Sequence, residues 1–515
     1  MPRFVFPRVV RAPRVFLAIG SFLLFVASTA TPASAQGIAG LGGATGVGGV
    51  GGVLGGAGGL SGAGGIGGAG GLGGIGGASG AGGIGGAGAA GGAGGIMIDA
   101  DGVIVPVFSK SRAPQLARKR REALAGKHLS ADVNAPSPLR KISLTRLEKA
   151  CEKHAADKTH VTVEMQYLAG LQRIDYVFVD VENKDIVIAG PAEGFAADEV
   201  GRIVGVTTGR PPIRIDDLMT GLRAVMRGER IGCSIDPDQQ RLAQLQNWLK
   251  ANSTPASAAV ARARYGEMAR ILGTHHVSVW GVPADSHFGQ ALVEADYRMK
   301  LLALGLERSQ VRGFTSYLAV LGQQGNTTQR WWFTPLYDAF HRTEEGDAFQ
   351  IAGQRAQLLS QDEVTDALGN RKDAAFTRLS TSRFAQVFTD KFPELAEESA
   401  ALGELQNLID IAVVAALLKK ERLPQKVDWK MSLFLDPQRA TLTKGNAPKE
   451  IQSMYNVKQA RGAMLGVIAG GVEIDADAIV ASIPFENEGG TRLSGVRAMA
   501  LEEKDKAEND SWWWD

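Results

Sequence analysis

The seven histidines are the side chains in this sequence best suited to metal binding or to proton transfer near neutral pH. Their densest group is His275, His276 and His287, with Asp285 close to the last. On a strand, His275 and His276 point to opposite faces, so at most one of them can join His287 and Asp285. No two histidines have the His-Glu-x-x-His spacing of a zinc-binding helix. The pattern favours structural roles, such as a helix cap at Asp285 or Ser286, over a metal or catalytic site.

Other catalytic signatures are also missing. The sequence has no Gly-x-Ser-x-Gly elbow and no phosphate-binding loop ending in Gly-Lys-Ser or Gly-Lys-Thr. Glu294 and Asp296 lie two residues apart in an expected helix, so they do not share the face that paired acid-base catalysis needs. The 56 basic and 54 acidic residues nearly cancel, which excludes a general field that attracts nucleic acid. We therefore expect no cofactor, no metal and no nucleic-acid partner, and whether the protein is an enzyme stays open, with a non-enzyme favoured.

Two short runs could bind a polymer. Residues 331–333 are Trp-Trp-Phe in an expected strand, where the rings could stack on sugars, although filling the core is the commoner role. Residues 118–121 are Arg-Lys-Arg-Arg, which could contact an anionic envelope polymer or form a solvated helix face; the second is favoured. The only cysteines, Cys151 and Cys233, could pair or remain buried thiols.

The strongest candidate for docking is the end of the chain. Residues 496–515 form an acidic tail that finishes with Trp512, Trp513, Trp514 and Asp515. Exposed indole rings are unusual in a charged tail, so the three rings either fold back into a groove on the body or dock onto a partner. The acidic residues would be repelled by an anionic bilayer, so the expected partner is a protein of the cell envelope.

The first 35 residues have the features of a cleavable signal peptide. Arginines at positions 3, 8, 11 and 14 precede an apolar run at residues 15–28, and Ala-Ser-Ala at residues 33–35 offers a cleavage site before Gln36. The apolar run is shorter than the roughly 20 residues that cross a bilayer, so we expect no transmembrane span in the mature chain. The sequence predicts an exported protein that is periplasmic, envelope-bound or extracellular.

Residues 36–95 are almost wholly glycine with small apolar residues, and no proline, aromatic or charged residue occurs among them. Such a tract is typical of a low-complexity linker. The alternatives are a packed bundle of polyproline-II-like strands and self-association through the apolar side chains.

The remaining chain mixes strands with helices and has no regular βαβ period, which indicates an α+β fold with a mostly antiparallel sheet. We expect two α+β parts, at residues 96–272 and 273–495. The expected helices cover residues 114–125, 143–156, 216–226, 236–250, 258–272, 288–304 and 401–420. The expected strands cover residues 161–167, 174–181, 185–189, 274–282, 329–333 and 348–352.

Four stretches of the body resemble a family of exported bacterial proteins known as domain of unknown function 1598. They are residues 188–194, 233–237, 295–300 and 405–410, with the sequences IAGPAEG, CSIDP, ADYRMK and LQNLID. The resemblance implies an export signal and a shared body, and it implies no activity. We therefore expect an exported, non-catalytic binding or cell-envelope protein; the alternative is an extracytoplasmic hydrolase whose site is assembled from distant residues.

Overall fold

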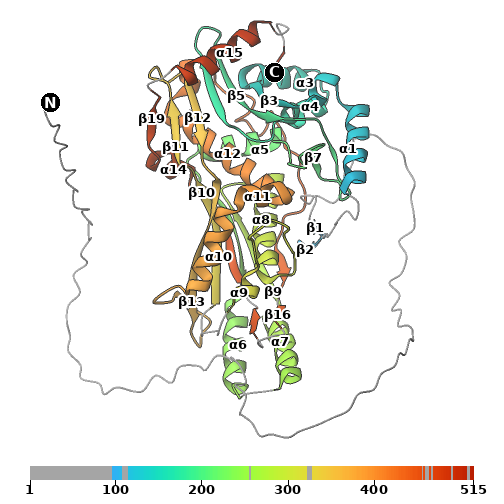
Figure 1. The fold of residues 1–515 in the computed structure, drawn as a ribbon, viewed down its shortest axis with the longest axis vertical. Helices are drawn as coiled ribbons and strands as arrows, with labels where there is room; N and C mark the ends of the chain where they lie inside the picture. Colours follow the sequence, from blue (N-terminus) through green and yellow to red (C-terminus); the bar gives the residue numbers. More distant parts are fainter. Residues whose placement is uncertain are drawn as a thin grey trace, which may run out of the picture. The chain divides into compact units, whose positions relative to one another are not determined.

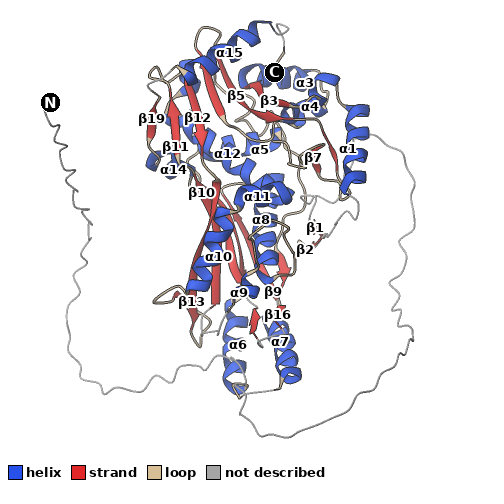
Figure 2. Cartoon of the chain, viewed as in Figure 1, coloured by secondary structure: helices blue, strands red, loops and turns tan. Residues whose placement is uncertain are grey.

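The fold consists of two large mixed sheets and the helices that pack on them (Figures 1 and 2). The computed structural model describes residues 96–515 apart from 107–113, 255–256, 322–327, 455, 459–462, 466–467, 489–490 and 507–510. The predicted signal peptide and glycine-rich tract lie outside the described residues.

The larger sheet has nine strands. In spatial order they are β1 (Ile96–Ile98), β2 (Val103–Pro106), β15 (Glu450–Gln452), β9 (Thr274–Trp280), β8 (Ile231–Pro237), β18 (Ile468–Ile474), β10 (Thr328–Leu336), β13 (Arg355–Thr365) and β14 (Arg371–Asp373). The pairs β2–β15 and β10–β18 are parallel, and the other neighbours are antiparallel.

The second sheet has seven strands. Their order is β19 (Phe485–Asn487), β11 (Ala339–Arg342), β12 (Ala348–Ala352), β4 (Tyr176–Asp180), β5 (Asp185–Ala192), β3 (Ser137–Ser143) and β20 (Trp513–Trp514). Only β11 and β19 are parallel within it. Both large sheets take strands from either side of residues 272–273. With helices and mostly antiparallel strands mixed along the chain, the predicted α+β class is confirmed.

Helix α12 (Ala400–Lys420) is the centre of the helical core. It contacts α5 (Ile215–Met226), α8 (His287–Leu304), α11 (Phe392–Glu398) and α14 (Ala476–Ser482). Among the described residues it is the one helix long and apolar enough to cross a membrane, and its whole apolar window is buried inside the protein. A helix that is apolar on every side belongs in a core, as its sequence indicates.

Other helices cover the sheets. α10 (Leu379–Asp390) packs on β13, and α6 (Gln239–Ala251) pairs with α7 (Ala258–Leu272) beside the end of the larger sheet (Figure 2). α15 (Arg492–Lys506) covers one face of the seven-stranded sheet, where Phe178 and Val187 are buried against Leu493. On the other face, Val177 and Val179 belong to the main core. The sheet is therefore buried on both faces, whereas the alternating pattern of β4 suggests burial of one.

Several apolar side chains that stand out in the sequence are buried in the core. Trp331 and Phe333 of β10 are fully buried and pack edge-on against aromatic rings of α9 (Tyr317–Val320), α10 and α11. This is the core-filling role favoured from the sequence. Cys151 and Cys233 are both buried free thiols. Burial raises the pKa of the Cys151 thiol to about 12 and the pKa of the Cys233 thiol well above its usual value, so neither is a reactive thiolate near neutral pH.

Three local expectations are wrong. Residues 161–167 were expected as a strand, but they contain the short helix α4 (Val163–Gln166), which begins because the Thr162 hydroxyl accepts a hydrogen bond from the Met165 N–H. The expected helix at residues 236–250 begins later, since Asp236 and Pro237 complete β8 and Asp238 is the cap. Thr145 and Glu148 have capping-box spacing, which predicts Thr145 as the cap of the helix expected at residues 143–156; that helix is present as α3 (Leu144–Ala156), but Ser143 caps it.

Candidate ligand-binding pocket

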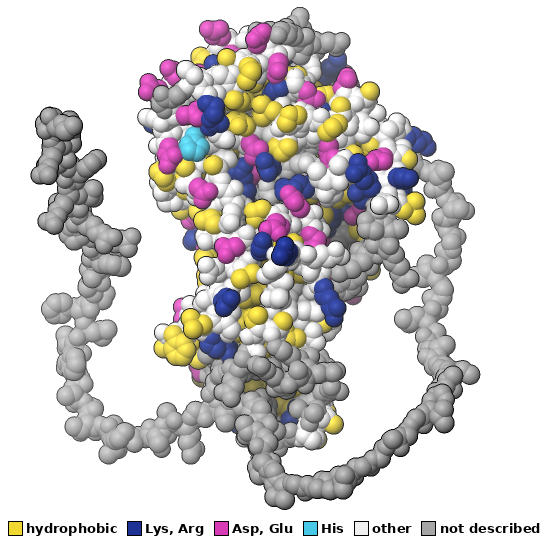
Figure 3. Space-filling view, viewed as in Figure 1, with side chains coloured by type: hydrophobic (Ala, Val, Ile, Leu, Met, Phe, Trp, Pro, Cys, Tyr) yellow, Lys and Arg dark blue, Asp and Glu magenta, His cyan; other side chains and the backbone are white. Residues whose placement is uncertain are grey.

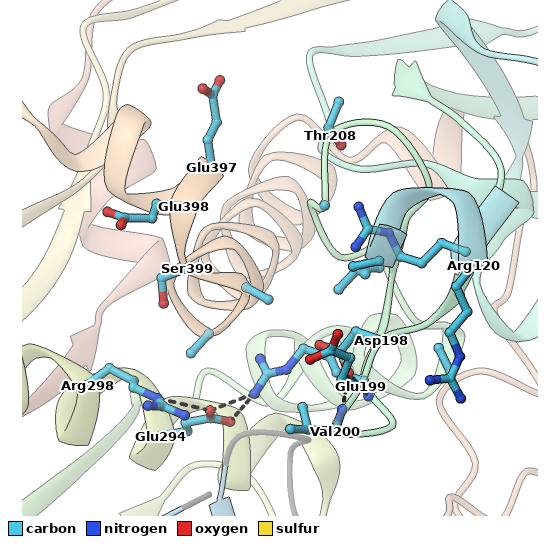
Figure 4. Close-up of a pocket in the computed structure, with 18 of the residues that line it drawn as sticks. Arg120, Asp198, Glu199, Val200, Thr208, Glu294, Arg298, Glu397, Glu398 and Ser399 are labelled. Atoms are coloured by element: carbon cyan, nitrogen blue, oxygen red, sulfur yellow. Dashed lines mark hydrogen bonds and ion pairs between the residues drawn. The ribbon is translucent and has the colours of Figure 1, made fainter. Parts of the chain in front are cut away.

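A cavity of about 400 Å³ with many charged lining residues lies where four segments of the chain meet, and we call it the charged pocket (Figure 4). This size is typical of sites for small molecules. Its floor comes from α8, and its walls come from α1 (Pro114–His128), the β6–β7 region (Phe195–Ala197 and Ile203–Gly205) and the α11–α12 junction. Its charged lining residues are Arg120, Arg121, Asp198, Glu199, Arg202, Glu294, Arg298, Glu307, Glu397 and Glu398.

The floor is held by ion pairs around Glu294. Glu294 is fully buried, and both of its carboxylate oxygens lie 2.6 Å from an Arg202 guanidinium nitrogen. One turn further along α8, Arg298 lies 3.5 Å from Glu294 and donates a 2.9 Å hydrogen bond to Glu307. Side chains four residues apart share a helix face, so Glu294 and Arg298 both reach the pocket. Asp296 faces away and bonds to Lys300 at 2.7 Å, as expected for two carboxylates on different faces.

The ion pairs continue behind the floor into the core. Arg202 donates a second hydrogen bond, at 2.7 Å, to Glu404 of α12, and Glu404 lies 3.7 Å from His287 at the start of α8. The His287 ring nitrogen Nδ1 lies 2.8 Å from Asp217 of α5. Burial lowers the pKa of His287, but Asp217 and Glu404 outweigh burial and raise it to about 9. His287 is therefore a buried cation that links three helices.

The wall formed by residues 198–209 is fixed from within. The Asp198 carboxylate accepts 2.9 Å hydrogen bonds from the backbone N–H groups of Val200 and Arg202, and burial raises its pKa despite them. The buried Glu193 accepts hydrogen bonds from the Thr208 hydroxyl, from the Gln172 amide and from the backbone N–H groups of Thr207 and Thr208, and together these outweigh burial and lower its pKa. The loop that lines the pocket is thus held by two internal carboxylates.

Charges of both signs reach the opposite walls of the charged pocket. Figure 4 shows Arg120 on α1 on the opposite side of the cavity from Glu397, Glu398 and Ser399, with the carboxylates of Glu397 and Glu398 pointing away from Arg120. Glu397 bonds to Arg210 at 2.7 Å, and Glu398 accepts the Gln310 N–H at 2.8 Å. On the visible outer face, positive and negative side chains are likewise interspersed, without a broad area of one charge (Figure 3). A ligand in this cavity would meet cationic and anionic groups together.

The histidine group considered from the sequence is not assembled into one site. His275 is buried, and burial lowers its pKa to about 4, while the side chain of His276 on the opposite face is 57% exposed. Asp285 pairs with Lys444 at 3.0 Å, and His287 belongs to the ion pairs behind the pocket. Within the described residues, no group of three or more His, Cys, Asp or Glu side chains could hold a metal ion.

The three tail tryptophans lie on the body of the protein. Trp513 and Trp514 form the edge strand β20 on β3, and Trp514 is 5% exposed with its indole N–H bonded to the Ala500 carbonyl. Trp512 packs against the main core. Folding back onto the body is the first of the two alternatives left open from the sequence; docking on an envelope partner stays a prediction.

Sequence patterns do not single out the pocket residues. Arg120 and Arg121 belong to a basic run that looks like a solvated helix face, and that face is partly solvated here, since Arg118 pairs with Glu122 at the surface. Arg202 meets Glu294 and Glu404 across 92 and 202 residues of chain, separations that no local pattern encodes. The one available signal is the density of charges in α8, a helix with four charged residues among mostly apolar ones.

The comparisons with known proteins agree with the resemblance seen in the sequence. Residues 233–317 match the model of a family described as "Protein of unknown function (DUF1598)". The matched segment contains the stretches CSIDP and ADYRMK and all of α8, so it includes the floor of the charged pocket. No curated protein and no solved structure matches the chain.

Proposed function

We propose that this protein is an exported, non-catalytic binding protein of the cell envelope, and that the charged pocket holds a small zwitterionic molecule. The observation that carries this proposal is the opposition of Arg120 and Arg121 on one wall to Glu397 and Glu398 on another, across a cavity of about 400 Å³. A molecule with a carboxylate and an ammonium group can satisfy both walls at once. Amino acids and short peptides have this chemistry.

Support for export comes from the beginning of the chain. The spaced arginines, the short apolar run and the Ala-Ser-Ala sequence together meet the requirements of a signal peptide. An exported chain whose charged pocket has the size of a small-molecule site suits capture of a solute outside the cytoplasm.

Support for binding over catalysis comes from how the deep carboxylates are bonded. Glu294 is held by Arg202, and one oxygen of Asp198 is occupied by two backbone N–H groups. Both carboxylates thus have structural partners, which limits their freedom to transfer protons. Hydrolysis is the second candidate function, and the raised pKa of Asp198 is the specific observation that favours it, because a general acid needs such a pKa.

Calorimetric titration of the mature chain tests the proposal. The probes are a panel of amino acids and dipeptides, each with its N-acetylated and C-amidated forms. We expect saturable binding of one or more zwitterions and a loss of roughly tenfold or more in affinity when either charge is blocked, as for the loss of a charge-assisted hydrogen bond. Equal binding of the blocked forms, or no binding across the panel, would contradict the proposal.

A pair of neighbouring substitutions provides the control. Arg120→Glu reverses a charge that lines the cavity, whereas Lys119→Glu makes the same change on an exposed side chain of α1 outside the lining. The Arg120 variant should lose affinity at least roughly tenfold and the Lys119 variant should keep it. Appearance of a cleaved product in the wild type that Asp198→Asn abolishes would instead establish the hydrolase.

A further inference from the structure

The C-terminal strand occupies a groove that is built to receive it. β20 lies antiparallel to β3, with Trp513 opposite Ile142 and Trp514 opposite Lys141, and the Ser143 N–H donates to the Trp512 carbonyl at 2.9 Å. Without these residues, β3 would be the edge of the seven-stranded sheet, and an exposed edge is a template for another strand. We call the edge of β3 together with Arg140 the tail groove.

Arg140 gives the tail groove its specificity. Its side chain is fully buried, and its guanidinium makes a fork with the Asp515 side chain, at 2.8 Å from Nε and 2.6 Å from a terminal nitrogen. The same guanidinium lies 4.7 Å from the centre of the Trp513 ring. A two-point fork and a cation–π contact together select an acidic residue with an aromatic residue two positions before it.

Arg140 is also held in place by contacts that do not involve the tail. Arg140 also donates hydrogen bonds to four backbone carbonyls, which belong to Asp132, Val133, Ala135 and Ala169. These carbonyls orient the guanidinium but do not neutralise it, and the carboxylate paired with it among the described residues is Asp515. Removal of Asp515 would leave the buried Arg140 guanidinium without a carboxylate, which is unfavourable. The groove therefore has a strong requirement for a carboxylate.

Every copy of the chain has one tail groove and one matching tail. We propose that the groove is an exchange site in which the C-terminal strand of a second copy of this chain replaces the chain's own. An exchanged pair makes the same contacts as two separate copies, so the balance between them depends on protein concentration and on the connecting chain. Two copies that exchange tails reciprocally form a closed dimer.

Exchange in the unmodified protein is the first test. Two preparations of the mature wild-type chain with different tags are mixed at high concentration, incubated and diluted, and native mass spectrometry measures dimers that carry both tags. We expect mixed dimers whose share rises with the concentration of the incubation. Copies that never form mixed dimers at any concentration would overturn the proposal.

A complementary pair of full-length variants locates the contact. Asp515→Arg has an intact groove and a tail that Arg140 repels, whereas Arg140→Lys has an intact tail and lacks the fork. We expect the two variants to form a one-to-one mixed dimer, and neither to dimerise alone. Asp515→Glu is the control and should behave as wild type.

Binding of a labelled peptide tests the groove independently of the segment that occupies it. The peptide Ser-Trp-Trp-Trp-Asp should bind Asp515→Arg at least roughly tenfold more tightly than wild type, whose own tail competes. Binding of the peptide without any mixed dimer would overturn the proposal that a second copy of the chain occupies the groove. It would favour a different protein that ends in an acidic residue, such as an envelope partner. If neither peptide binding nor a mixed dimer is observed, the tail is a fixed strand of the fold.

Discussion

The stability of the folded protein should depend on the protonation of His287. It lies among Asp217, Glu404 and Arg214, and its pKa rises from 6.5 to about 9 on folding because Asp217 and Glu404 outweigh burial and the nearby arginine. A group whose pKa is raised by folding stabilises the protein below its unfolded pKa, and this stabilisation is lost as the pH rises through the folded pKa. The contribution of His287 should thus be complete below pH 6.5 and lost by about pH 9.

Substitution of His287 tests this dependence. Chemical unfolding of wild type and His287→Gln should differ by an amount on the order of 2–3 kcal/mol near pH 6, and the difference should disappear above about pH 9. The exposed His276, changed to Gln, is the matched control and should not produce the difference. If the free energies of unfolding of wild type and His287→Gln change in parallel from about pH 6 to about pH 9.5, the His287 ring is not a buried cation.

At the scale of helices, close packing of α5 on α12 leaves no room at Gly221. A Cβ atom there would lie 2.4 Å from the Cγ2 methyl of Ile411, a stiff branched side chain in the core. Gly221→Ala should therefore destabilise the protein by about 1–3 kcal/mol, although alanine is the better helix former. Gly495→Ala in α15 is the matched control, because nothing lies within 4 Å of the added atom. That variant should gain up to about 1 kcal/mol.

Thermal unfolding measures both variants directly. Opposite signs for the two Gly→Ala changes are expected, since intrinsic helix propensity is the same at both positions and only the surroundings differ. Stabilisation by Gly221→Ala would mean that α5 and α12 can move apart without loss, and the packing of the helical core described here would be wrong.

Sequence patterns predicted most helices and strands because hydrophobic periodicity and caps act locally. α8 ends at Gly305 with φ +66°, as a glycine directly after an expected helix predicts. Local patterns failed where a distant residue competes. Thr145 and Glu148 have capping-box spacing, but Thr145 donates to Asp185, and Glu148 accepts hydrogen bonds from the Trp429 indole and two backbone N–H groups of the same segment.

The residues of the charged pocket cannot be predicted from the sequence for the same reason. Its pairs join residues that are far apart in the chain, and the same residue types elsewhere are ordinary surface charges. The place of Arg120 in the cavity wall depends on where α1 lies relative to α12, which its basic run does not specify. The three tryptophans mark the tail as unusual in the sequence, yet Arg140, which binds the tail, lies in a segment without any distinctive pattern.

At the scale of the whole molecule, the glycine-rich tract should be separable from the body. Its composition lacks the side chains that build a core, so deletion of residues 37–95 should leave the melting temperature of the body nearly unchanged. Calorimetry and the oligomeric state of the deletion variant check this prediction. A large loss of stability or a change of oligomeric state would show that the tract packs against the body or against other copies.

The central claim is that the charged pocket holds a small zwitterion outside the cytoplasm. The most direct measurement is native mass spectrometry of the mature protein isolated from its own cell envelope, followed by release and identification of any bound small molecule. We expect one zwitterionic molecule per chain, retained by Lys119→Glu and lost from Arg120→Glu. Isolation of the wild type without a bound molecule, or with a molecule that Arg120→Glu retains equally well, would contradict the claim.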